Sequence, residues 1–158
     1  MKRFWSDVTV IEAGRGWQVA LDGRPLKTQG GAAQIVPSEG LAQALAEEWR
    51  AQGEEIDSQG FAFRDMADYA IDAVRADRAS ATNALLAFAQ TDTLCYRADP
   101  EDALYRRQQE VWEPLVAAFE AREAVSLPRI SGILHRAPAE ATLARLRQRL
   151  EGLDDFTL

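Results

Sequence analysis

The chain has 158 residues, of which 47% are hydrophobic and 27% are charged, and its formal net charge is −7. This composition is ordinary for a globular protein that can bury its own core. The negative charge argues against nucleic acid as a partner, since phosphate binding needs concentrated Lys and Arg. The single cysteine, Cys95, excludes an internal disulfide and a metal site built from several thiolates.

No apolar run approaches the roughly 20 residues that are needed to cross a bilayer. The first five residues carry two charges and no apolar stretch, so they do not form a secretory signal. We therefore expect a bacterial cytoplasmic protein, or an organellar one whose presequence has been removed. Nothing in the composition sets the oligomeric state, and a monomer is the expected form.

The first third of the chain has the pattern of a small antiparallel sheet. Residues 8–11 are a β-branched run, residues 17–21 form a second strand, and 26–28 and 34–36 are shorter segments of the same kind. Asp22-Gly23 lies between the second and third of these segments. A type I′ turn needs positive φ at both central positions, and Asp-Gly supplies it. Because Pro25 cannot donate to a ladder, the strand after this turn is expected at an edge.

A helix is predicted to follow and to cover the sheet. Ser38 is a good N-cap, Leu41, Leu45 and Trp49 recur along one face, and Gly53 is the expected end. From residue 64 onward the pattern is mainly helical. The helical signals in this part are a face marked by Met66, Ala70, Ala73 and Val74, a second marked by Leu85, Leu86, Phe88 and Ala89, a start at Asp99-Pro100, a kink or division at Pro114, and a last helix opened by Pro138.

The predicted fold class is therefore α+β, with an N-terminal α/β domain over residues 1–63 and a helical domain over 64–158. The pattern near residues 77–81 leaves open whether two helices are continuous there. The sequence ends on Asp154-Asp155-Phe156, which has the form of an N-cap and the first turn of a further helix. We therefore expect the helical domain to be truncated at its C-terminus.

Residues with catalytic chemistry are few. His135 is the only histidine and has no Ser or Cys at a motif spacing, so a structural or surface role is favoured. Cys95, between Leu94 and Tyr96, has the surroundings of a buried small hydrophobe. The glycine pairs lack the dinucleotide and P-loop patterns. We predict no catalytic, cofactor or metal site. One enzyme class stays open, a hydrolase with two carboxyl groups about 5 to 10 Å apart.

Charged residues in half-buried segments leave two interpretations open. Asp92 and Arg97 lie in 91–97, and Arg64, Asp68 and Asp72 lie on a helix that must pack. They either form an ion-pair network that ties the helices to the sheet or present a polar surface to another protein.

Four aromatic residues divide into two pairs by their position in the sequence. Trp49 and Trp112 stand at helical spacing among apolar neighbours, so both are expected to be substantially buried. Phe4 and Trp5 lie near the terminus, where burial is harder, and are candidate contacts with a partner.

Taken together, eight segments resemble the assembly chaperone that binds the alpha subunit of the F-type ATP synthase catalytic head, a family of mitochondria and alphaproteobacteria. The segments are Arg3-Phe4-Trp5, Gly16-Trp17-Gln18-Val19, residues 21–28, Ala46-Glu47-Glu48-Trp49 with Gln52-Gly53, Ala70-Ile71-Asp72, residues 91–97, Arg107-Gln108 and Trp112-Glu113-Pro114. The pattern departs at Gln29-Gly30 and in residues 61–65.

The resemblance implies an α/β domain followed by a helical domain that continues past residue 158, no catalysis and no cofactor. It also implies an ATP-independent chaperone that binds unassembled alpha subunit, shields its beta-facing surface and is displaced on assembly. The residues singled out for partner binding are Phe4, Trp5, Asp92 and Arg97. The mitochondrial matrix is the implied location of eukaryotic relatives. The alternatives are a protein-binding module with another client and the carboxylate hydrolase.

Overall fold

The computed structural model of the chain describes residues 1–132 and 134–158, which divide into two compact units. Unit 1 comprises Met1–Arg78 and Asp154–Leu158, and unit 2 comprises Ala79–Leu153. The sequence places a boundary after residue 63, whereas the compact units divide after Arg78. The reason is that the helix beginning at Ala62 packs in the first unit and contributes Ala67 to its hydrophobic core.

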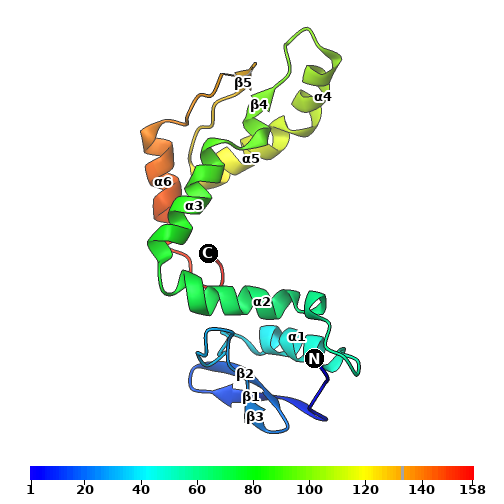
Figure 1. The fold of residues 1–158 in the computed structure, drawn as a ribbon. Coiled ribbons are helices and arrows are strands. Elements are labelled where there is room, and N and C mark those ends of the chain that lie inside the picture. Colours follow the sequence, from blue (N-terminus) through cyan, green and yellow to red (C-terminus); the bar gives the residue numbers. More distant parts are fainter. Residues whose placement is uncertain (133) are drawn as a thin grey trace. The chain divides into compact units, whose positions relative to one another are not determined.

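Unit 1 contains an antiparallel sheet in the order β1-β2-β3, formed by β1 (Val8–Ala13), β2 (Gly16–Leu21) and β3 (Arg24–Pro25) (Figure 1). The predicted turn is confirmed, since Asp22 and Gly23 have φ of 47° and 75°. Pro25 lies in the edge strand, as expected, but β3 begins and ends earlier than residues 26–28. The segment 34–36 forms no strand and makes only an isolated bridge from Val36 to Trp17, so that prediction is wrong.

Asp22 has a second structural role besides forming the turn. Its Oδ1 accepts hydrogen bonds from the backbone N–H groups of Ser6, at 3.0 Å, and Asp7, at 2.8 Å. These two donors stabilise the carboxylate and hold the pKa of Asp22 below its usual range. The turn residue therefore also fixes the segment that leads into β1.

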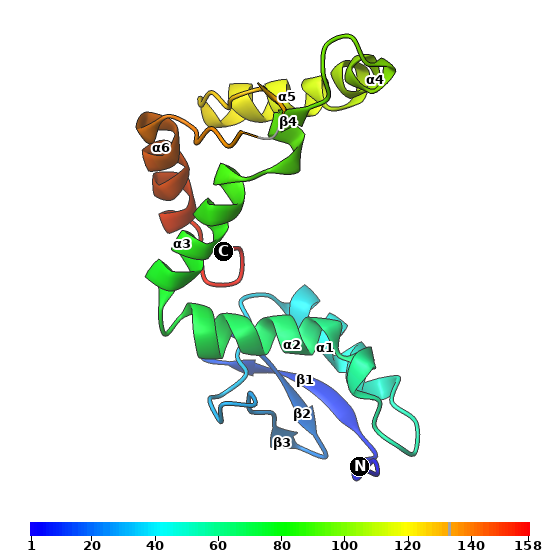
Figure 2. The ribbon, with the colours of Figure 1, turned by 45° about the horizontal axis from the view of Figure 1, so that its top comes forward.

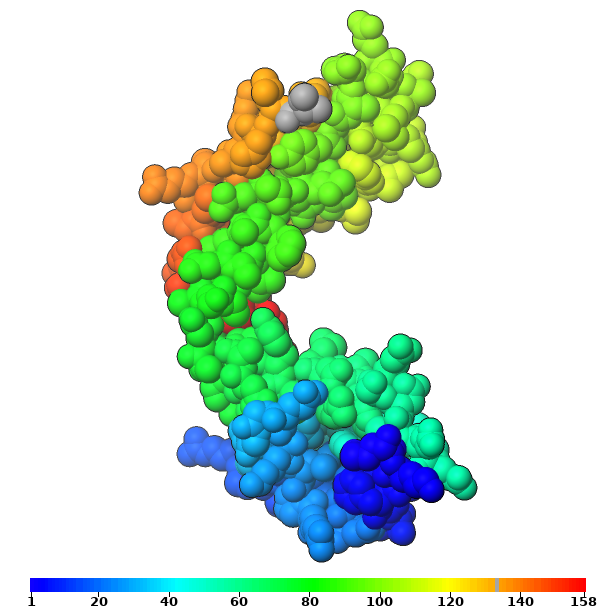
Figure 3. All heavy atoms as spheres, in the orientation of Figure 1, coloured from blue at the N-terminus to red at the C-terminus, as the bar shows by residue number. Residues whose placement is uncertain are grey.

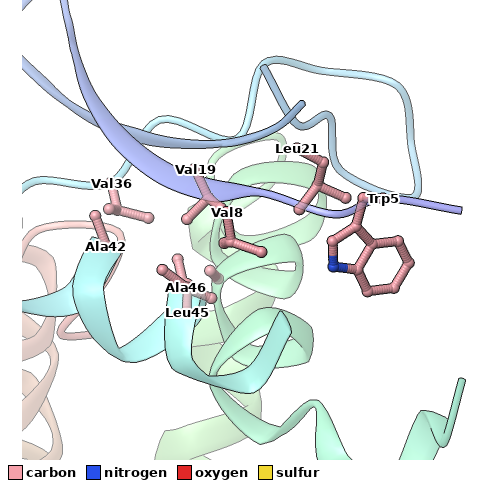
Figure 4. Packing of buried hydrophobic residues seen from close by; sticks show 9 residues of the cluster. Trp5, Val8, Val19, Leu21, Val36, Ala42, Leu45 and Ala46 are labelled. Carbon is pink, nitrogen blue, oxygen red and sulfur yellow. The ribbon is translucent and has the colours of Figure 1, made fainter. Parts of the chain in front are cut away.

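Helix α1 (Glu39–Arg50) packs against β1 and β2, and α2 (Ala62–Tyr69) packs against α1. The Ser38 hydroxyl accepts from the backbone N–H of Leu41 at 3.2 Å, which confirms the N-cap. The helix ends at Arg50, before Gly53, so the predicted end is wrong by one turn. Figure 4 shows the resulting core, with Val8, Val19, Leu21 and Val36 above Ala42, Leu45 and Ala46 of α1.

Helix α2 is followed by a π-helical turn, η2 (Ala70–Val74), and a short 3₁₀ turn, η1 (Ser58–Gly60), precedes it. Met66 does not face the core, because 70% of it is exposed. The buried side is formed by Ala67, Asp68, Ala70, Ile71 and Val74. The predicted face is thus partly wrong: Ala70 and Val74 are buried as expected, whereas Met66 and Ala73 are exposed. Asp68 takes a buried position because it has hydrogen-bond partners there.

Unit 2 is mainly helical (Figure 2), and the chain enters it through α3. Its elements are α3 (Arg78–Gln90), η3 (Thr93–Cys95), β4 (Tyr96–Arg97), α4 (Ala103–Val111), α5 (Glu113–Glu123), β5 (Ile130–Ser131) and α6 (Glu140–Glu151). Strands β4 and β5 pair in parallel. Together with unit 1, these elements confirm the α+β class: a three-stranded antiparallel sheet packed on a helix, then a mainly helical region.

The helix boundaries that were predicted from prolines in unit 2 agree with the structure in some cases and not in others. Pro114 divides two helices, α4 and α5, as expected. The start predicted at Asp99-Pro100 is wrong: the Asp99 carbonyl accepts from Asp102 N–H at 2.9 Å in a turn, and α4 begins at Ala103. Helix α6 begins two residues after Pro138. Among the helices that the structure describes, none is long and apolar enough to cross a membrane.

Candidate partner-binding surfaces

The two aromatic residues near the N-terminus have opposite environments. Phe4 is 70% exposed, and Figure 3 shows the first residues of the chain at the surface of unit 1. Trp5 is only 3% exposed and points into the core beside Leu21 (Figure 4). The expectation that Trp5 is exposed is therefore wrong. Within this pair, Phe4 alone has a side-chain surface that another protein can cover.

Trp5 is buried because an aromatic row receives it. Its ring meets Trp49 edge to face with centroids 4.9 Å apart, and Trp49 lies 4.6 Å from Phe61. Phe4 extends this row outward, with its ring centroid 5.1 Å from that of Trp5 and an interplanar angle of 81°. The Trp5–Trp49 and Trp49–Phe61 pairs each add about 0.5–1.5 kcal/mol beyond the area they bury, and the pair made by the exposed Phe4 adds less. The exposed Phe4 ring is thus supported by a rigid aromatic base. Trp49 is half-buried, in partial agreement with the prediction.

In unit 2, Asp92 is exposed while Arg97 is buried at 4% exposure. Asp92 caps η3 by accepting from Leu94 N–H at 2.8 Å. Arg97 donates to the Leu94 carbonyl and to Glu113 Oε2, the latter at 3.2 Å. Its guanidinium also lies 5.6 Å from the half-buried ring of Trp112. Arg97 therefore holds unit 2 together internally, and Asp92 does not pair with it.

The charged side chains of α2 and η2 are likewise engaged: Arg64 pairs with its neighbour Asp65 at 2.7 Å, whereas Asp68 and Asp72 bind backbone and side-chain donors of a loop. Asp68 accepts from Gln34 Nε2 at 2.5 Å and from Gln29 N–H at 3.1 Å. Asp72 accepts from Thr28 Oγ1 at 2.7 Å and from Gly30 N–H at 2.8 Å. Both carboxylates thus fasten the loop over residues 28–34. The helical layer is tied to the sheet as the first interpretation expected, but by hydrogen bonds to a loop.

The dense ion-pair network lies instead in unit 2, around Arg129. Its guanidinium contacts Glu113 Oε1 and Glu120 Oε1 at 2.5 Å each, with further bonds at 3.1 and 3.0 Å to their second oxygens. Hydrogen bonding to Arg129 is the main cause that lowers the pKa of both glutamates, and the same contacts raise the pKa of Arg129. An acid catalyst needs a raised pKa, so this carboxylate pair does not have the properties of a hydrolase site.

The single histidine and the single cysteine also have surroundings typical of structural residues. His135 Nδ1 lies 3.0 Å from the Tyr96 hydroxyl. Over residues 1–132 and 134–158, no cluster of three or more His, Cys, Asp or Glu side chains could hold a metal. Cys95 is buried, as predicted, and burial raises the pKa of its thiol, with the nearby Asp92 charge as the second cause.

Unit 2 contains an apolar pocket of about 510 Å³ that the sequence patterns did not predict. Its lining comes from four elements: Ala89 of α3, Leu94 and Cys95 of η3, Leu115, Val116, Ala118, Phe119 and Arg122 of α5, and Leu146 of α6, together with Asp92 and Leu127. Leu115 is 57% exposed. Although α5 supplies five of the lining residues, the others come from segments distant in sequence, so no local periodicity reveals the pocket. Asp92 is the one predicted contact residue that lines it.

Unit 1 carries a second apolar surface on α2. Phe63, Met66 and Tyr69 are spaced three residues apart and are 48%, 70% and 63% exposed. Residues at this spacing share one face of a helix. Exposed apolar side chains grouped in this way are typical of surfaces that contact another protein. We call these three residues the α2 row.

Comparison with known proteins assigns the family. Residues 2–120 match the model of the ATP12 chaperone protein family, which is three quarters of the chain. The chain belongs to the ATP12 chaperone family. This family consists of non-enzymatic chaperones, in agreement with the prediction that the chain is not an enzyme.

Individual relatives agree with this assignment. The chain is 29% identical over 170 residues to the mitochondrial protein atp12 of Schizosaccharomyces pombe, with 99% of this chain and 58% of the relative covered. The crystal structure of Atp12 from Paracoccus denitrificans superposes with a TM-score of 0.90 at 35% identity, over 98% of this chain and 66% of that one. The Atu1473 protein of Agrobacterium tumefaciens, a putative chaperone by its description, gives 0.88 at 31%, over 95% and 56%. The chain thus spans less than two thirds of the length of these relatives.

Proposed function

We propose that this chain is part of a chaperone for ATP synthase assembly that binds the unassembled alpha subunit, without ATP, until the beta subunit replaces it. The observation that carries the proposal is the match of residues 2–120 to the ATP12 chaperone family.

The physical basis is competition for one surface. An unassembled subunit exposes an apolar interface that its neighbour later covers, and such a surface promotes aggregation until it is capped. A protein that caps it needs only moderate affinity, because it must yield to the true partner. Mass action by the beta subunit is then sufficient for release, and no nucleotide hydrolysis is required.

Two exposed side chains remain from the predicted contact set, Phe4 and Asp92. Phe4 is suited to insert into an apolar pocket of the client, since its ring is mostly exposed and contacts Trp5 edge to face. Asp92 lines the apolar pocket of unit 2 and offers a charge beside it. The α2 row and that pocket supply further apolar area of the kind that matches the exposed client interface.

The test uses refolding alpha subunit and light scattering. Adding the 158-residue chain at equimolar concentration is expected to lower the scattering, and titrating beta is expected to release the chain, read by size-exclusion chromatography without ATP. The Paracoccus relative, which is longer, serves as the positive control and should act at lower concentration. Unchanged scattering with this chain and with the relative would reject the client. A complex of all three proteins that persists at saturating beta would reject competition.

Point variants distinguish the loss of a client contact from the loss of folding stability. Phe4→Ser should weaken the protection of alpha while leaving the melting temperature of the chain near that of the parent, because the side chain is mostly exposed. Phe88→Ser makes the same chemical change at a residue of α3 that is 73% exposed and was not predicted as a contact. Equal loss of protection in both variants would show that exposed apolar area in general, and not Phe4, carries the binding.

A further inference from the structure

The last five residues of the chain, Asp154–Leu158, belong to unit 1, although the whole of Ala79–Leu153 intervenes in the sequence. The chain therefore leaves unit 1 after Arg78 and returns to it after Leu153. Unit 1 is built from two separate pieces of sequence, and unit 2 is an insertion between them. The contacts between Asp154–Leu158 and Met1–Arg78 therefore decide whether both ends of the inserted unit 2 are attached to unit 1.

The second piece is held by a charged contact and an apolar one. Asp155 Oδ2 accepts from Arg75 Nε at 3.1 Å, and Oδ1 pairs with Arg78 Nη1. The Asp155 side chain is 23% exposed, which is little for a surface carboxylate. The partly buried Phe156 packs against the hydrophobic core of unit 1. The contact therefore combines a carboxylate shared by two guanidinium groups with an anchored ring.

The tail is also ordered within itself. Asp154 accepts from Phe156 N–H at 2.9 Å and from Thr157 Oγ1 at 2.6 Å, so its carboxylate caps the short turn that follows. A capped turn loses less chain entropy on docking than a free tail does. The turn presents Asp155 and Phe156 together to unit 1.

The two arginines stand at the point where the chain leaves unit 1. Arg75 directly follows the π-helical turn η2, and its N–H donates to the Ala70 carbonyl at 3.0 Å. Arg78 is the last residue of the first piece. Asp155 is the second residue of the returning piece. The pair Arg78–Asp155 thus joins residues 77 positions apart that flank the two crossings.

We propose that residues 154–158 form a clasp that closes unit 2 into a loop on unit 1 and restrains both crossing segments. With the clasp closed, the outgoing and returning chains are anchored to the same arginines, so little free chain remains at either crossing. With the clasp open, Arg75 and Arg78 lose their contact with the Asp155 carboxylate, and residues 154–158 lose the contacts that hold them on unit 1. The device responds to ionic strength, because the paired groups are only partly buried.

The experiment is limited trypsin digestion of the whole native chain, followed by mass spectrometry. The two clasp arginines are themselves trypsin sites. In Asp155→Asn, cleavage after Arg75 and Arg78 should accelerate about threefold to tenfold relative to cleavage after Arg15, as expected for local opening after loss of a partly buried pair. Arg15, exposed in the β1–β2 turn, is the internal standard for the amount of active protease.

The matched control is Asp65→Asn, which removes a carboxylate from the surface pair with Arg64 and should leave the ratio unchanged. Raising NaCl should move the parent toward Asp155→Asn while changing that variant little. If Asp155→Asn does not fold, Phe156→Ala and the salt titration of the parent test the same clasp. An unchanged cleavage ratio in the Asn variant or in Phe156→Ala, or a parent whose ratio is insensitive to salt, would overturn the proposal.

Discussion

Replacing Arg129 by Met should destabilise unit 2 more than any other single loss of a charged side chain in that unit for which the structure gives partners. Arg129 joins two glutamates that lie seven residues apart on α5 to the segment that precedes β5. Its side chain is 26% exposed, and those of Glu113 and Glu120 are 34% and 20% exposed. The network is therefore intermediate between a surface and a buried ion pair.

The magnitude follows from that intermediate position. Breaking a buried pair costs about 3–5 kcal/mol, and an exposed pair contributes about 0–1 kcal/mol. Glu113 keeps a hydrogen bond from Arg97 at 3.2 Å and Glu120 keeps one from Leu127 N–H at 2.6 Å, so neither carboxylate is left without a donor. We expect about 2 kcal/mol for Arg129→Met. At about 4–8 °C per kcal/mol for a domain of this size, the melting temperature should fall by about 10 °C.

Thermal unfolding followed by circular dichroism measures this, with Arg107→Met as the control. Arg107 pairs with Glu110 on α4, but both side chains are about 70% exposed, so that variant should lose less than about 0.5 kcal/mol. A double-mutant cycle with Glu120→Gln isolates the pairwise contribution. If Arg129→Met melts within about 2 °C of the parent, the network does not stabilise the unit and the reasoning fails.

The same network predicts how the difference in stability between the parent and Arg129→Met depends on pH. The pKa values of Glu113 and Glu120 are lowered in the folded state from an ordinary value of 4.5. Groups with lowered pKa contribute stability that is fully present above the unfolded value and is lost as the pH falls through the folded one. The gap between parent and Arg129→Met should thus be constant near neutral pH and close progressively below about pH 4.5. A gap that persists undiminished at pH 2 would assign the effect to packing of the arginine stem.

Three further outcomes are expected. Gly23→Ala should cost about 1 kcal/mol in urea unfolding because φ is 75°, whereas Gly40→Ala, in a helix with open space around it, should be neutral or stabilising. Cys95 should react slowly with a thiol reagent until denaturant is added, since burial raises its pKa. Trp5→Ala should cost about 3–5 kcal/mol by chemical unfolding, and Phe4→Ala less than about 0.5 kcal/mol; equal costs would contradict the two burial states.

Features set by neighbouring residues were predictable. The Asp22-Gly23 turn, the Ser38 cap and the division at Pro114 each depend on the dihedral angles or hydrogen bonds of a few adjacent residues. The burial of Cys95 also followed from its apolar neighbours. These local choices agree with the final fold, which is why the α+β class could be inferred.

Features that depend on residues distant in the sequence could not be predicted. Trp5 is buried because Trp49 lies beside it, itself in contact with Phe61, and no residue near position 5 in the sequence encodes these contacts. Arg97 pairs with Glu113 and not with Asp92, which is nearer in sequence. The face of α2 was misassigned because an apolar residue, Met66, is exposed and a charged one is buried. In each case tertiary contacts overrode the periodicity.

The corrected contact set also limits how the client can be held. Fully covering a large apolar side chain is worth about 1.5–3 kcal/mol, and Phe4 is already 30% covered by the chain itself, being 70% exposed. Even with the α2 row added, partial coverage yields a total near the roughly 8 kcal/mol of micromolar binding before any cost is subtracted. Association and ordering consume about 4 kcal/mol or more. Under the proposed function, a client that contacted unit 1 through these side chains alone would bind weakly, and the apolar pocket of unit 2 beside Asp92 offers further apolar surface for it.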